Sequence, residues 1–81
     1  MRIFNLNNEY NIVCNSESTR YGFRHIATLH KAGYSIAKTK VCYYNRTWER
    51  FEFESVLNKV IKDNFSGQER VDFLEVIKTI N

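Results

Sequence analysis

The chain has 81 residues, of which 43% are apolar and 26% charged, and it contains six Phe and five Tyr but no Pro. This composition predicts a single small globular domain over residues 1–81 and excludes a disordered or low-complexity chain. No apolar run approaches the ~18 residues of a membrane span, and the first residues lack the apolar stretch of a signal peptide. We therefore expect a cytoplasmic protein without a membrane partner.

The first half of the chain predicts three strands, at about 9–17, 21–29 and 35–43. In the second of these, alternate residues share one face, namely Tyr21, Phe23, His25, Ala27 and Leu29. A three-residue hairpin loop, Lys31-Ala32-Gly33, is expected between the last two strands. That loop would pair His25 with Thr39 and leave Arg24, Lys38 and Lys40 together on the opposite face.

The second half predicts two helices. Apolar residues recur every three or four positions from Phe53 to Ile61 and again from Phe73 to Ile80, which indicates one buried stripe on each helix. Residues 48–53 fit either a short fourth strand or the first turn of a helix, and we favour the helix. The predicted fold is α+β: a three-stranded antiparallel sheet covered on one face by two C-terminal helices, in the order β-β-β-α-α.

Charge is distributed unevenly along the chain. Residues 18–48 contain six Lys or Arg and no acid, whereas residues 49–81 contain five bases and seven acids. A surface of one sign concentrates counter-charge, so the first half is where an anionic partner would dock. The candidate partner-binding residues are Arg20, Arg24, Lys38, Lys40, Tyr44, Arg46, Trp48 and Arg50. For Trp48, a second interpretation is that it fills the gap between the sheet and the first helix.

The sequence predicts that the protein is not an enzyme. His25, Cys14 and Cys42 fall in predicted strands with no acid nearby in sequence, so we expect His25 to be a hydrogen-bonded residue of the inner face. Three neighbouring acids, Glu49, Glu52 and Glu54, are interpreted as a solvated edge rather than a catalytic pair. Phosphate-loop and metal-ligand spacings are absent, and no cofactor or metal is expected.

Two segments carry a distinctive pattern: TRYGFRH at 19–25 and CYYNRTWERFEFESVL at 42–57. They resemble a group of short uncharacterised proteins encoded by phages and prophages of Gram-positive bacteria, over roughly residues 16–61. The resemblance implies a non-enzymatic accessory protein in the host cytoplasm. It would act by stoichiometric binding to host or defence machinery, for instance as an anti-CRISPR-type inhibitor.

Two classes of partner remain open at this stage. Arg and Trp are common anchors in protein interfaces, which favours a host or defence protein, including one within a nucleoprotein complex. Basic residues interleaved with Tyr are also typical of surfaces that follow phosphates and stack bases, so a small nucleic-acid-binding protein is the alternative. The sequence leaves the oligomeric state open, with a dimer among the alternatives.

Overall fold

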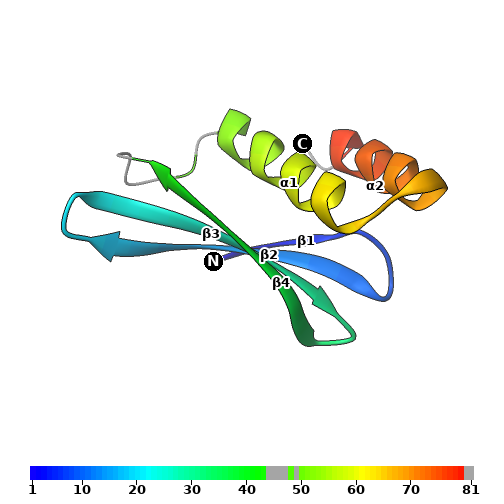
Figure 1. Cartoon of the computed structure of the whole chain (residues 1–81), viewed down its shortest axis with the longest axis horizontal. Coiled ribbons are helices and arrows are strands. Elements are labelled where there is room, and N and C mark those ends of the chain that lie inside the picture. Colours follow the sequence, from blue (N-terminus) through cyan, green and yellow to red (C-terminus); the bar gives the residue numbers. More distant parts are fainter. Residues whose placement is uncertain (44–47, 49, 80–81) are drawn as a thin grey trace.

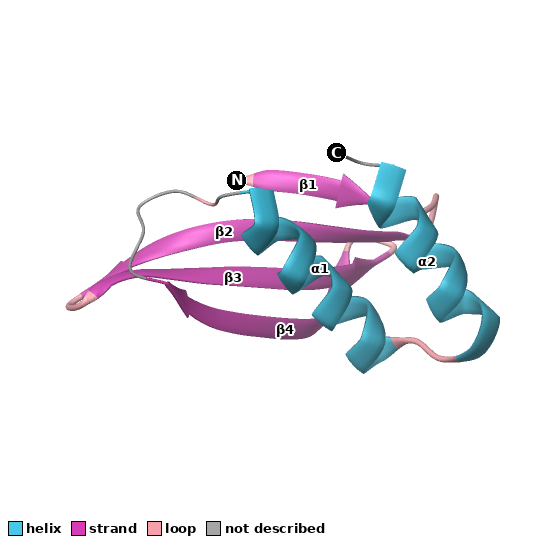
Figure 2. Ribbon diagram, turned by 90° about the horizontal axis from the view of Figure 1, so that it is seen from above, coloured by secondary structure: helices cyan, strands magenta, loops and turns pink. Residues whose placement is uncertain are grey.

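A computed structural model of the chain describes residues 1–43, 48 and 50–79. Its elements are the strands β1 (Arg2–Asn5), β2 (Tyr10–Thr19), β3 (Gly22–Lys31) and β4 (Tyr34–Tyr43), followed by the helices α1 (Arg50–Asn64) and α2 (Gly67–Thr79). The strands form one antiparallel sheet in the order β1-β2-β3-β4. Figure 1 shows both helices on the same side of this sheet, and Figure 2 shows the strand order from above.

The predicted α+β class is confirmed, with two C-terminal helices on one face, but the predicted number of strands is wrong. β1 is an additional strand that pairs with Asn11–Cys14 at the start of β2. Of the four side chains of β1, only that of Phe4 is buried, so the sequence offers too short an alternation to reveal a strand. The following turn is held by Asn7, whose Oδ1 accepts hydrogen bonds from the N–H groups of Glu9 and Tyr10 at 2.8 and 2.7 Å.

The hairpin between β3 and β4 has a different turn from the one predicted. Lys31 pairs with Tyr34, which leaves a two-residue turn of Ala32 (φ 51°) and Gly33 (φ 85°). Two positive φ angles define the type I′ turn, whose twist matches that of the flanking strands. The turn and a register irregularity between Leu29 and His30, of the kind a β-bulge makes, together pair His25 with Val41 rather than Thr39, a shift of two residues. Because side chains alternate with a period of two, this shift leaves residues 23–29 of β3 and 37–43 of β4 on their predicted faces.

The core lies between the sheet and the helices. Ile12, Ala27, Leu29 and Ile61 are fully buried there. The helical stripe is confirmed, since Val56, Leu57, Val60 and Ile61 of α1 are all buried. α1 begins at Arg50, so the ambiguous segment from residue 50 onward is helix rather than strand. The prediction that Tyr21 lies on the inner face of the strand is wrong: it lies in the turn before β3 and is 78% exposed.

The two helices meet in a tight connection. Gly67, the first residue of α2, has a φ of +61°, which favours glycine. Arg70 of α2 reaches back to the end of α1 and donates hydrogen bonds to the backbone carbonyls of Lys62 (2.7 Å) and Phe65 (2.8 Å). Within the described residues, neither helix combines the length and apolar character that crossing a bilayer requires.

Candidate functional site

The side of the sheet that faces away from the helices carries most of the predicted binding residues whose side chains are described. Strand register places them, because paired residues share a face and the buried residues Ala27 and Leu29 mark the inner one. We call the opposite side the uncovered face, and its members include Ile3, Asn5, Asn11, Val13, Asn15, Glu17, Arg24, Ile26, Thr28, His30, Lys38 and Lys40.

Lys38 and Lys40 are the centre of positive charge on this face. They stand two residues apart on β4, opposite Thr28 and Ile26 of β3, and both are exposed. Among the described residues neither lysine forms an ion pair, since the four carboxylate–cation pairs at 3.0–3.4 Å involve other side chains. Two adjacent ammonium groups without a carboxylate make a site that an anionic group would stabilise.

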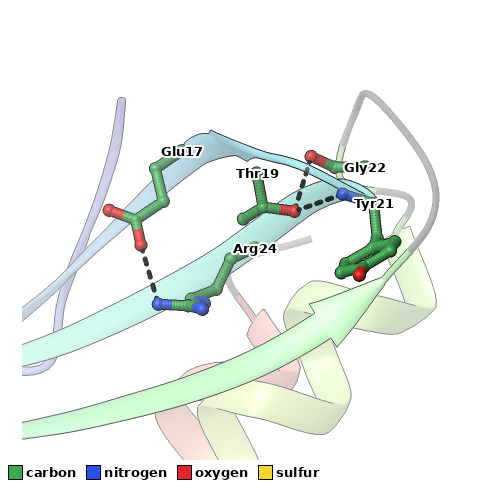
Figure 3. Close-up of polar contacts among 5 residues, drawn as sticks. All are labelled: Glu17, Thr19, Tyr21, Gly22 and Arg24. Carbon is green, nitrogen blue, oxygen red and sulfur yellow. Dashed lines mark hydrogen bonds and ion pairs between the residues drawn. The ribbon is translucent and has the colours of Figure 1, made fainter.

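Arg24 belongs to the same face but is partly neutralised. Its Nη1 lies 3.2 Å from Oε1 of Glu17, the residue directly opposite on β2. Figure 3 shows this pair beside the turn, where the Thr19 hydroxyl donates to the Gly22 carbonyl at 3.0 Å and accepts from the Tyr21 N–H at 3.3 Å. Arg20 lies in that turn, exposed, with its guanidinium 5.9 Å from the centroid of the Tyr21 ring.

Trp48 lies on the other side of the sheet. Its ring stacks on Phe53 of α1 at 4.7 Å and 12°, and it lies 4.2 Å from the ring of His25 on β3. Trp48 is therefore partly buried between the sheet and α1, as its second interpretation expected, and is separate from Lys38 and Lys40. Tyr44 and Arg46 fall outside the described residues, as does the side chain of Arg50, the first residue of α1.

A buried polar cluster joins the sheet to α1, and sequence reasoning did not find it. His25 is fully buried, and its Nδ1 lies 2.6 Å from Oγ of Ser16 on β2. Its Nε2 lies 4.0 Å from Oε2 of Glu52, which is also fully buried. The prediction that Glu52 belongs to a solvated edge is thus wrong, whereas a hydrogen-bonded His25 on the inner face is confirmed. No local pattern links Glu52 to His25, because the helix–sheet packing brings them together across 27 positions of sequence.

Burial sets the proton affinities of this cluster. Desolvation lowers the pKa of His25 below its usual 6.5, although the nearby Glu52 carboxylate opposes that shift. The thiol of Cys14, buried beside it on β2, has its pKa raised by desolvation from 9.0 to about 12, against the opposing effect of Arg2. At neutral pH His25 is therefore uncharged and Cys14 is a thiol rather than a nucleophilic thiolate.

Ser16, His25 and Glu52 are residue types used in nucleophilic catalysis, and they lie together where α1 meets the sheet. The 4.0 Å between Nε2 of His25 and Oε2 of Glu52 is longer than a hydrogen bond between these two atoms. Ser16 and Cys14 do reach an open hollow of about 360 Å³, whose wall also includes Arg2 and Trp48. Within the described residues no three His, Cys, Asp or Glu side chains gather closely enough to hold a metal ion.

We compared the chain with models of protein families, with curated proteins and with solved structures, and none of these comparisons gave a match.

Proposed function

We propose that the chain is a non-enzymatic binding protein whose uncovered face docks on an acidic surface of a protein partner. The observation that carries this proposal is the exposed pair Lys38 and Lys40 on the sheet face opposite to α1 and α2. Solvent-facing aliphatic groups adjoin these charges, including the half-buried Ile26 directly opposite Lys40. Protein interfaces typically combine charged groups, which select the partner, with apolar surface that is buried on binding.

The phage resemblance supplies the biological setting of the proposal. A small protein of this kind would act in the bacterial host cytoplasm by stoichiometric binding to host or defence machinery, and inhibition of a CRISPR-type nuclease is one form of that action. The uncovered face supports a protein target over nucleic acid, because its positions among the described residues include no Phe, Tyr or Trp. Proteins that hold single strands use such rings as stacking platforms, so the uncovered face would have to rely on phosphate contacts alone.

The test is affinity capture from lysate of a Gram-positive host, with and without nuclease treatment. Three baits are compared: the wild-type chain, Lys38→Glu with Lys40→Glu, and a matched control, Lys59→Glu with Lys62→Glu. The control makes the same charge change on exposed positions of α1. We expect a partner that the wild type and the control recover equally and that the Lys38/Lys40 variant loses, whatever the nuclease treatment.

Two results would overturn the proposal. Equal recovery by all three baits would show that Lys38 and Lys40 do not take part in binding. Recovery that nuclease abolishes, together with an affinity for nucleic acid that falls steeply with salt concentration, would assign the face to phosphate binding instead.

A further inference from the structure

The free edge of β4 is the longest unpaired backbone in the described part of the structure. β4 has ten residues and lies at the end of the strand order, so only its inner side is paired, with β3. The opposite edge of the sheet is divided between β1, which has only four residues, and residues 15–19 of β2, which extend beyond it. An open edge presents a row of N–H and C=O groups that another extended chain can pair with.

The side chains of β4 restrict which chain can pair there. A strand added beside β4 would place every second side chain on the uncovered face, next to Lys38 and Lys40. Cross-strand neighbours of like charge are destabilising, whereas a carboxylate beside each lysine is stabilising. The lysines therefore exclude basic strands and favour strands with acids at alternate positions.

A second copy of the chain fits this edge poorly. If two β4 strands paired antiparallel about Thr39, with their helices on the same side, Lys38 of one copy would lie opposite Lys40 of the other. Lysine on an edge strand is a recognised device against self-association for this reason. In this register the lysines disfavour a second copy, whereas a different chain of opposite charge would be stabilised beside them.

We propose that the protein binds its partner by strand addition, in which an extended acidic segment with carboxylates at alternate positions pairs with the free edge of β4. This inference rests on the proposed function and makes it more specific. Backbone hydrogen bonds hold the segment in place, and Lys38 and Lys40 select its side chains. Addition of a strand at this edge requires no rearrangement of the hydrophobic core, because Lys38 and Lys40 are already exposed.

Synthetic peptides test the mode of binding on the wild-type protein. The probe is a ten-residue peptide of alternating Glu and Val, and the comparison peptide replaces every Glu by Lys. Two further versions of the acidic peptide carry N-methyl groups at all Glu or at all Val residues. In a strand, only every second residue directs its N–H and C=O groups toward a given neighbouring strand. One methylated version should therefore lose its hydrogen bonds to β4 and bind about tenfold or more weakly, while the other retains its affinity.

Binding is measured by calorimetry, and the site is mapped by NMR shifts of the β4 amides. We expect the acidic peptide to bind and the Lys peptide not to bind. Lys38→Glu with Lys40→Glu should remove binding, while Lys59→Glu with Lys62→Glu should leave it unchanged.

Failure of this inference and failure of the proposed function are distinguishable. Equal affinity of both N-methylated peptides, or no binding of the acidic peptide, would overturn strand addition. The lysate experiment would still decide whether Lys38 and Lys40 bind a partner through a folded acidic surface.

Discussion

His25 shows how one side chain can be polar, buried and structurally important at once. It lies between Ser16 of β2 and Glu52 of α1, with the ring of Trp48 at 4.2 Å. Burial of an imidazole is tolerable when it is neutral and hydrogen-bonded, which is the state that its lowered pKa favours near neutral pH. The cluster lies at the junction of α1 and the sheet, where Glu52 of α1 faces His25 of β3 at 4.0 Å.

The lowered pKa of His25 gives the stability of the protein a pH dependence of predictable sign. The unfolded chain takes up a proton at His25 near pH 6.5, whereas the folded chain does so only at lower pH. The free energy of unfolding should therefore decrease as the pH falls below about 6.5, until the folded pKa is passed. Chemical denaturation of the wild type and of His25→Gln between pH 7.5 and 5 measures this effect, and the variant should show the shallower slope.

An NMR titration of the imidazole protons measures the pKa of His25 in the folded protein directly. His30→Gln removes the only other imidazole and so assigns the signals. A midpoint for His25 at or above 6.5 would contradict the assignment of a lowered pKa.

At the scale of elements, the junction between α1 and α2 depends on a single side chain. The last carbonyls of a helix have no partner within it, and Arg70 of the next helix satisfies that of Lys62 in the last turn of α1 and that of Phe65 just after it. Its positive charge also lies at the negative end of the α1 dipole. A planar guanidinium suits this role because it donates in two directions at once.

Replacing Arg70 should destabilise the protein without changing its fold. We expect Arg70→Met to lower the free energy of unfolding by about 1–2 kcal/mol, because two hydrogen bonds to carbonyl groups are lost. For a domain of this size the corresponding fall in Tm is about 4–16 °C, at roughly 4–8 °C per kcal/mol. Thermal denaturation followed by circular dichroism measures the shift.

The matched control for that experiment is Lys78→Met, which removes an exposed cation near the end of α2. Surface changes of this kind usually alter stability by less than ~0.5 kcal/mol. Equal Tm values for the two variants would show that the contacts of Arg70 do not stabilise the helix junction.

The elements also show how far sequence reasoning reaches. Strand alternation and helical spacing are patterns of apolar residues that repeat over many positions. The faces of β3 and β4 and the apolar stripe of α1 were therefore predictable. A turn depends on two residues, and Ala32 at positive φ gave no signal because alanine rarely adopts that conformation. Arg24, Lys38 and Lys40 were predicted to share the face on which they lie, but in a register two residues out, because neither the turn nor the irregularity between Leu29 and His30 was foreseen.

The missed features share a cause. β1 has one buried side chain, and Glu52 is buried through a contact that only the assembled fold creates. Non-local packing of this kind leaves no periodic trace in the sequence. Of the candidate site, Arg24, Lys38 and Lys40 could be grouped from the sequence, whereas the ion pair of Arg24 with Glu17 and the inner position of Trp48 could not.

For the whole molecule, charge on β4 should govern self-association. We expect the two lysines to disfavour pairing between the open edges of separate copies. We expect Lys38→Thr with Lys40→Thr to form dimers or larger species at concentrations where the wild type is monomeric, because the edge then carries strand-favouring neutral residues. Sedimentation velocity at low and high salt measures the association.

Lys59→Thr with Lys62→Thr is the control for that variant, since it removes the same charge from α1 instead of β4. If both variants associate equally, net charge rather than the edge of β4 controls solubility. If neither associates, the lysines have no protective role at the edge.

The separation of the two sides of the sheet has an evolutionary consequence. Among the described residues, the buried hydrophobic core lies between the sheet and the helices, whereas outward positions of β2, β3 and β4 such as Val13, Ile26 and Lys40 are not part of it. Mutations there can accumulate at little cost to folding, because stability limits which substitutions survive. Lineages facing a changing target could thus exchange outward residues freely while inheriting the same interior.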